Sequence, residues 1–183
     1  MREQIPNIIT TARILAVAPL CWLLWHEAWG PALAILVVAA LSDGLDGFLA
    51  RYFGWRSRLG ALLDPLADKL FIVSITLVFG LRGHLPGWLV WMILLRDVII
   101  LAGALAYWRL HRTLEMQPLF ISKVNTALQL LLLAITLVHV AFHPLPPLTM
   151  TGLYWLVGIT TLLSGTTYVL LWSLRAIRST RDH

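Results

Sequence analysis

Six long apolar stretches, separated by short polar or turn-forming breaks, constrain this chain more than any other feature. A helix needs about 20 largely apolar residues to cross the hydrocarbon core of a bilayer. Hydrophobic residues make up 59% of the 183 residues and charged residues 13%, more apolar than a soluble domain of this size could bury. The sequence therefore predicts an all-α membrane bundle, one domain over 1–183, with transmembrane helices at 9–28, 31–53, 60–82, 86–109, 119–142 and 150–174.

Arginine is distributed unevenly between the two sides that this layout implies. The connections after the second and fourth stretches and both chain ends are rich in arginine, whereas the other connections carry only Arg82. Because basic residues favour the cytoplasmic side, we expect both termini to be cytoplasmic. The net charge of +5 then suits anionic lipid headgroups. The basic residues form no long tract, so no nucleic-acid partner is expected.

The first apolar stretch imitates a secretory signal, because it follows a basic residue, Arg2. No small-residue cleavage site follows it, and Leu20 before Cys21 does not suit lipoprotein cleavage, so we expect a retained helix. Cys21 is the only cysteine, which excludes a disulfide within the chain. Without an organelle presequence, the expected location is a bacterial inner membrane. The mitochondrial inner membrane stays open if a leader has been trimmed.

Four aspartates flank the second connection. Asp43 and Asp46 are three residues apart on one predicted helix, and Asp64 and Asp68 are four apart on the next, so each pair shares a helix face. A short loop makes the two helices antiparallel neighbours, and the four carboxylates can converge just below the cytoplasmic surface. Buried anions there are costly unless cations compensate them. Carboxylates are hard ligands suited to Mg²⁺ or Mn²⁺, and two such ions can clamp a phosphoryl centre.

Small residues accompany these aspartates at the same helix ends: Gly44, Gly47, Ala50, Gly60 and Ala61. Glycine inside a helix costs about 1 kcal/mol relative to alanine, so a reason for its presence is expected. One reason is room for a nucleotide close to the backbone. The other is close helix packing through small residues, and the sequence leaves both open.

The combined pattern D-x-x-D-G-x-x-A-R-x8-G-x3-D-x3-D resembles the signature of the CDP-alcohol phosphatidyltransferases, a family of six-helix membrane enzymes. The resemblance covers nearly the whole chain. It implies a homodimer, and two divalent cations held by Asp43, Asp46 and Asp64, with Asp68 as both ligand and general base. It also implies a CDP pocket lined by Asp43, Gly47, Ala50, Arg51 and Gly60.

The second half of the chain is expected to select the acceptor alcohol. The segment 118–130 and the pair Arg96-Asp97 resemble the CMP-forming cardiolipin synthase branch of that family. This implies CDP-diacylglycerol and phosphatidylglycerol as substrates, with Lys123, Arg96 and Asn125 binding the acceptor. The phosphatidylglycerophosphate synthase branch tends to carry a second lysine where Asn125 stands. One cation fewer suits a phosphodiester better than the dianionic phosphate of glycerol 3-phosphate.

Other readings of the polar residues remain at this point. A cation transporter would also carry intramembrane acids, although these would be expected to span the bilayer as a relay. Arg96 and Asp97 fall near mid-membrane, where they pair with another helix or shape the acceptor pocket. Asn7 and Arg13 are expected to cap the cavity from the N-terminal segment.

Overall fold

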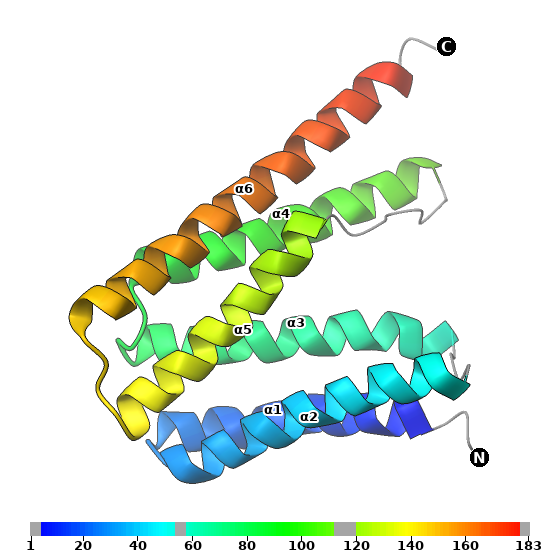
Figure 1. The fold of residues 1–183 in the computed structure, drawn as a ribbon. Helices are drawn as coiled ribbons and strands as arrows, with labels where there is room; N and C mark the ends of the chain where they lie inside the picture. The colour runs from blue at the N-terminus through cyan, green and yellow to red at the C-terminus, as the bar shows by residue number, and fades with distance from the viewer. Residues whose placement is uncertain (1–4, 54–57, 112–119, 180–183) are drawn as a thin grey trace. The chain divides into compact units, whose positions relative to one another are not determined.

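The computed structural model describes residues 5–53, 58–111 and 120–179 (Figure 1), and side chains over most of these ranges. The described residues form six α-helices and no strand, which confirms the all-α prediction. The helices are α1 (Ile5–Trp25), α2 (Trp29–Phe53), α3 (Arg58–Leu81), α4 (Gly87–His111), α5 (Phe120–Ala141) and α6 (Pro147–Ser179).

The first turn does not lie where the sequence predicts it. The predicted helices 9–28 and 31–53 leave the break at residues 29 and 30, but both residues begin α2, and Pro31 lies in its first turn, where proline has no helical hydrogen bond to lose. The chain turns at residues 26–28 instead. Glu27 takes the left-handed conformation at φ 59°, and the Ala28 N–H donates to Leu23 O at 2.9 Å. This is a Schellman ending, with glutamate at the position that glycine usually holds.

The turn after α3 has the same geometry with the usual residue. Gly83 is left-handed at φ 77°, and the His84 N–H donates to Phe79 O at 2.8 Å. The two turns are joined by an ion pair between Glu27 and Arg82, whose guanidinium also lies 5.7 Å from the centre of the Trp25 ring. These contacts offset part of the cost of a left-handed glutamate.

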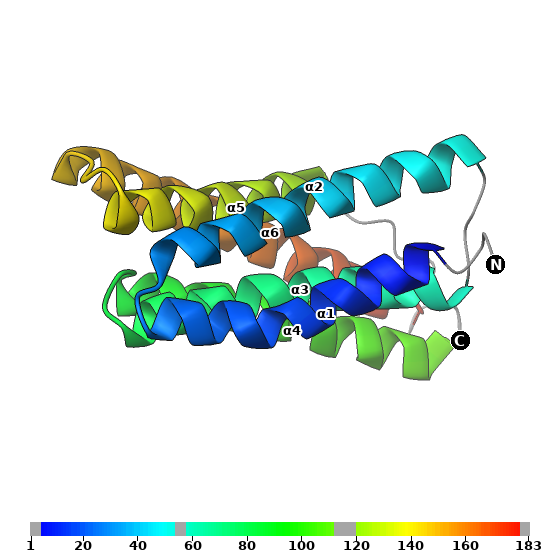
Figure 2. The ribbon, with the colours of Figure 1, turned by 90° about the horizontal axis from the view of Figure 1, so that it is seen from below.

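The chain divides into two compact units. Unit 1 contains α1, α2, α3 and the end of α5 from Leu133, and unit 2 contains α4, α6 and the start of α5 up to Leu132. In unit 1, α1 packs against both α2 and α3, which run in opposite directions (Figure 2). Its buried side chains include Leu20, Leu24, Ile72, Ile75 and Phe79.

Unit 2 is built on the contact between α4 and α6. Leu89, Ile93 and Val157 are buried there. Gly158 lets the helices approach closely, because a Cβ at this position would lie 2.9 Å from the Trp88 ring. The Trp88 ring in turn lies 5.1 Å from the Trp155 ring, between centroids.

The described part of the chain contains two helices that are long and apolar enough to cross a bilayer, by length and composition. They are Phe120–Ala141 and Pro147–Leu171. Large apolar side chains are also widely exposed on the units, among them Trp91 at 74% and Leu101 at 69%. The full membrane bundle and the cytoplasmic termini stay predictions.

Candidate active site

The acidic motif occupies the ends of α2 and α3 that meet the connection 54–57. Positions 43 and 46 lie in the second half of α2, and positions 64 and 68 in the first half of α3. Since the two helices run in opposite directions, both pairs lie toward the same end of unit 1 (Figure 1). The side chains of Asp43, Asp46, Asp64, Arg51 and the other CDP-pocket residues are outside the described ones, so their convergence stays a prediction.

Asp68 is the motif carboxylate whose contacts the structure describes. Its Oδ1 accepts a hydrogen bond from Arg13 Nη1 of α1 at 2.7 Å. The arginine side chain is 4% exposed and the aspartate side chain 45%. Sequence reasoning placed Arg13 near the cavity but missed this partner. A lone arginine in an otherwise apolar helix was the available signal, because such a residue needs a counter-charge.

A hollow of about 490 Å³ lies along α1 and α2. Its walls are mostly small or apolar, and they include Arg13 and also Ser42, the residue before Asp43. The Ser42 hydroxyl donates to Val38 O of its own helix at 2.6 Å. The residues that line it are Ala12, Arg13, Ala16, Ala34, Ile35, Val38, Ala39 and Ser42.

Among the predicted acceptor residues, Arg96 forms the centre of a buried network in unit 2. Its side chain is 4% exposed. Nη1 donates to Asp97 Oδ1 at 2.7 Å, and Nη2 donates to Ser122 Oγ of α5 at 2.5 Å and to Ser164 Oγ of α6 at 2.7 Å. The cost of burying the guanidinium is thus offset by a neighbouring carboxylate and by hydroxyls from two other helices.

Asn125 forms a second network one turn further along α5. It is fully buried, and its Oδ1 accepts from Thr160 Oγ1 at 2.9 Å and Thr161 Oγ1 at 3.0 Å. Thr161 also accepts from Gln129 Nε2 at 3.5 Å. Lys123, the third predicted acceptor residue, is exposed near the start of α5. Of the three predicted acceptor residues, Lys123 is therefore exposed, whereas Arg96 and Asn125 are buried.

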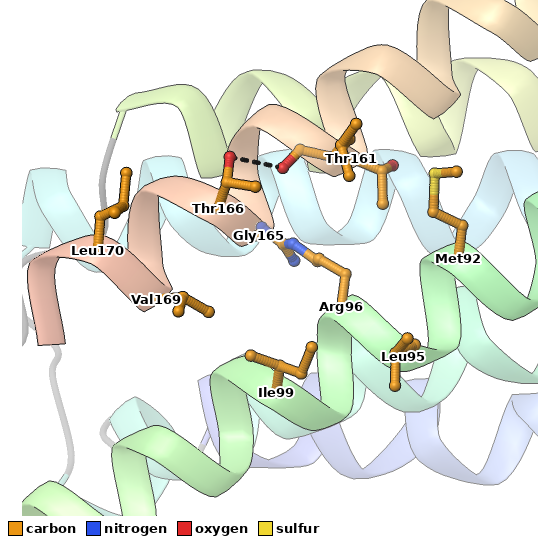
Figure 3. A pocket seen from close by; sticks show the side chains of 10 residues that line it. Met92, Leu95, Arg96, Ile99, Thr161, Gly165, Thr166, Val169 and Leu170 are labelled. Atoms are coloured by element: carbon orange, nitrogen blue, oxygen red, sulfur yellow. Dashed lines mark hydrogen bonds between the residues drawn. The ribbon is translucent and has the colours of Figure 1, made fainter. Parts of the chain in front are cut away.

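An apolar groove of about 360 Å³ lies between α4 and α6 (Figure 3). The Arg96 side chain reaches from α4 toward Gly165 of α6, and a Cβ at Gly165 would lie 3.5 Å from Arg96 Cγ. The rest of the lining is largely aliphatic, from Met92, Leu95 and Ile99 on α4 to Val169 and Leu170 on α6. Thr166 on its rim donates to Leu162 O of its own helix at 2.9 Å.

Similarity to known proteins agrees with the motif. A rice chloroplastic CDP-diacylglycerol–glycerol-3-phosphate 3-phosphatidyltransferase is 34% identical, over 90% of this chain and 56% of its own length. Human cardiolipin synthase (CMP-forming) is 36% identical, over 90% of this chain and 60% of its own. A Schizosaccharomyces pombe fusion of cardiolipin synthase (CMP-forming) and a mitochondrial hydrolase is 33% identical, over 92% and 31%.

The chain thus spans less than two thirds of the length of these curated relatives. The model of the CDP-alcohol phosphatidyltransferase family matches residues 3–173, across both units. The chain belongs to the CDP-alcohol phosphatidyltransferase family.

Proposed function

We propose that this chain is a CMP-forming cardiolipin synthase, which transfers a phosphatidyl group from CDP-diacylglycerol to phosphatidylglycerol and releases CMP. The observation that carries the proposal is the family match over residues 3–173, combined with the intact acidic motif within it. Three of the relatives similar over about nine tenths of the chain are named as CMP-forming cardiolipin synthases from human, rat and fission yeast. None of this favours a cation transporter.

The proposed chemistry is a direct displacement. Asp68 removes the proton from the acceptor hydroxyl, whose oxygen then forms a bond to the phosphatidyl phosphorus. The bond from that phosphorus to the bridging oxygen breaks, and CMP leaves with the electron pair. Asp43, Asp46, Asp64 and Asp68 would hold the two cations, since their oxygens are the ligand type that Mg²⁺ and Mn²⁺ prefer. When bound, these cations would neutralise the pyrophosphate and ease the departure of CMP.

CDP recognition is assigned to the small and basic residues of the motif. Gly47, Ala50, Arg51 and Gly60 would line the nucleotide pocket beside Asp43. The backbone places all five positions toward one end of unit 1, which supports a shared pocket. The same backbone placement supports close helix packing equally well. The assignment of a CDP pocket therefore depends mainly on the family motif.

The surroundings of position 125 support phosphatidylglycerol as the acceptor. Asn125 is fully buried against two threonine hydroxyls, with no carboxylate among its described partners. A second lysine there would place an uncompensated charge inside unit 2. Lys123, exposed nearby, then supplies the main positive charge for a single phosphodiester. The aliphatic groove beside Arg96 suits an acyl chain, which phosphatidylglycerol has and glycerol 3-phosphate lacks.

We also propose that the chain is one domain embedded in a membrane, with both termini cytoplasmic, and that it forms a homodimer. The two bilayer-length helices and the exposed apolar side chains support the membrane setting. The family match across both units supports one domain. The homodimer and a bacterial inner membrane, with the mitochondrial inner membrane as the alternative, rest on family resemblance and sequence pattern alone.

A second candidate is phosphatidylglycerophosphate synthesis, which the rice relative favours. Purified protein in detergent, given CDP-diacylglycerol and Mg²⁺, should release CMP when phosphatidylglycerol is added and form cardiolipin. Little product should form with glycerol 3-phosphate, and EDTA should abolish turnover in either case. A clear preference for glycerol 3-phosphate would replace the first candidate with the second. Full turnover after complete metal removal would contradict the metal assignment.

Lys123→Ala tests the acceptor side separately. We expect the KM for phosphatidylglycerol to rise roughly 10- to 150-fold, because a hydrogen bond to a charged group is worth about 1.5–3 kcal/mol. The KM for CDP-diacylglycerol should stay nearly unchanged. Lys123→Arg keeps the charge and should raise the KM for phosphatidylglycerol much less. Equal increases in both KM values would remove Lys123 from the acceptor site.

A further inference from the structure

The hydroxyl groups of α6 inside unit 2 have no role in the function proposed so far. Ser164 and Thr161 are almost fully buried, at 0% and 1% exposure, three residues apart on one face of α6. Ser164 contacts Arg96, and Thr161 contacts Asn125. Each hydroxyl is therefore bonded to a residue that the proposed function assigns to the acceptor.

These contacts leave two buried N–H donors, one on Arg96 and one on Asn125, without a hydrogen-bond partner among the described residues. Arg96 uses Nη1 on Asp97 and Nη2 on two serines, and its buried Nε has no partner among the described residues. Asn125 uses its carbonyl oxygen on the threonines, and its buried Nδ2 likewise has no partner in the described part of the chain. A buried donor left unbonded loses its hydration without a replacement, so such atoms are expected to meet a partner in the working enzyme.

We propose that Ser164 and Thr161 are positioning residues for the acceptor lipid. They hold the Arg96 guanidinium and the Asn125 amide in orientations that leave Arg96 Nε and Asn125 Nδ2 to donate to oxygens of the acceptor headgroup. This inference rests on the proposed function, and it adds α6 to an acceptor site otherwise assigned to α4 and α5. The asparagine is the sharper case, because Thr161 Oγ1 accepts from Gln129 Nε2 and directs its own proton to Asn125 Oδ1, which turns the NH2 end of the amide away.

The direct test is Thr161→Val, which removes the hydroxyl and keeps the shape of the side chain. The KM for phosphatidylglycerol should rise roughly 2- to 12-fold, the range that one hydrogen bond is worth. The kcat and the KM for CDP-diacylglycerol should change less than about twofold, since the substitution removes no contact to a residue assigned to CDP-diacylglycerol. Thr161→Ser restores a hydroxyl and should recover most of the acceptor affinity. Ser164→Ala should act in the same direction through Arg96.

Thr167→Val is the matched control. It makes the same substitution on the same helix, but Thr167 does not line the groove, and its hydroxyl donates to Leu163 O of α6 at 2.7 Å. It should leave all three kinetic constants unchanged. Melting temperatures of every variant report whether a change arises from loss of folded protein.

Several results would overturn the inference. It is wrong if Thr161→Val and Ser164→Ala leave the acceptor KM unchanged, or if both KM values rise together. It is also wrong if neither variant folds, because the hydroxyls are then structural. Running glycerol 3-phosphate in parallel separates this inference from the choice of acceptor. If the wild-type enzyme prefers glycerol 3-phosphate, the cardiolipin proposal fails, and the role of α6 is judged on the KM for that alcohol.

Discussion

At the scale of single residues, the pair formed by Arg13 and Asp68 connects the N-terminal helix to the proposed chemistry. The arginine is buried and the carboxylate is half exposed, so the charge-assisted hydrogen bond between them fixes one oxygen of a residue that still faces outward. A base must be held in a productive orientation as well as be present. Arg13 therefore orients Asp68 in addition to balancing its charge.

Asp68→Asn separates binding from chemistry. Asparagine keeps the size of the side chain and its capacity to accept from Arg13, but it cannot take a proton. We expect kcat to fall by about 10²-fold or more, the usual scale for a lost general base. Binding of CDP-diacylglycerol, followed by equilibrium dialysis, should survive better than in Asp43→Asn, which weakens a proposed dedicated metal ligand. Near-normal turnover in Asp68→Asn would exclude the base role.

At the scale of elements, the spacing of small residues along α6 determines how α4 lies against it. Gly158 admits the Trp88 ring, and Gly165 lies against the aliphatic part of Arg96. Between and beyond these contacts the helices leave the apolar groove open. The groove thus follows from side-chain volume, and a larger residue at Gly165 would narrow it.

Gly165→Leu tests whether the groove holds an acyl chain. The leucine should occupy the groove, and the KM for phosphatidylglycerol should rise several-fold, because burying a few methylene groups is worth about 0.8 kcal/mol each. Gly152→Leu is the control on the same helix, since a Cβ there meets open space. The assignment would be supported if the Gly165→Leu enzyme preferred phosphatidylglycerol with short acyl chains. An unchanged KM with a folded Gly165→Leu enzyme would contradict it.

The turn after α3 carries a titratable group whose environment is unusual. Burial lowers the pKa of His84, and the nearby charges of Arg82 and His139 lower it further. The ring lies edge-on to Trp29 and Phe79, at 5.5 and 5.9 Å between centroids. The folded protein therefore favours the neutral imidazole more than the unfolded chain does.

This predicts a loss of stability in acid with a definite sign. As pH falls below about 6.5, the unfolded chain takes up a proton at this histidine before the folded protein does, so the free energy of unfolding decreases. His84→Phe keeps an aromatic ring and removes the proton. Its melting temperature in detergent should fall less than that of the wild type between about pH 8 and about pH 5.5. A steeper fall in the variant would show that the sign is wrong.

At the scale of the whole molecule, the proposed donor residues lie in unit 1 and the proposed acceptor residues in unit 2. One helix, α5, contributes to both units, with Asn125 on its first part and His139 on its last. The family match crosses this division without a break. This is consistent with one catalytic domain whose two substrates are recognised by different parts of the chain.

Membrane orientation is testable at this scale because Cys21 is the only cysteine. In a Cys21→Ser background, Leu148→Cys lies in the first turn of α6, at a side chain that is 84% exposed. A membrane-impermeant thiol reagent should label it from the non-cytoplasmic side of sealed vesicles. Arg181→Cys, outside the described residues, should react only after the membrane is opened. The reverse pattern would place the termini outside.

The sequence alone determined the number and order of the helices, because apolar stretches of bilayer length are a local property of the chain. It also determined the family, since the spacing of Asp43, Asp46, Asp64 and Asp68 is specific without any tertiary information. It placed the first turn wrongly at residues 29 and 30, because a left-handed Glu27 is not expected from local sequence, and its partner Arg82 lies 55 residues away. Local propensity cannot report such a contact.

Only the tertiary structure decided which polar side chains meet. The sequence named Arg13, Arg96 and Asn125 as noteworthy, but it could not assign Asp68, Ser164 and Thr161 as their partners. Serine and threonine are common in helices and carry no signal of burial by themselves. Their role depends on helix rotation and separation, which follow from packing around residues such as Gly158 and Gly165. Long-range packing therefore decided the polar networks, whereas local pattern decided the helices and the acidic motif.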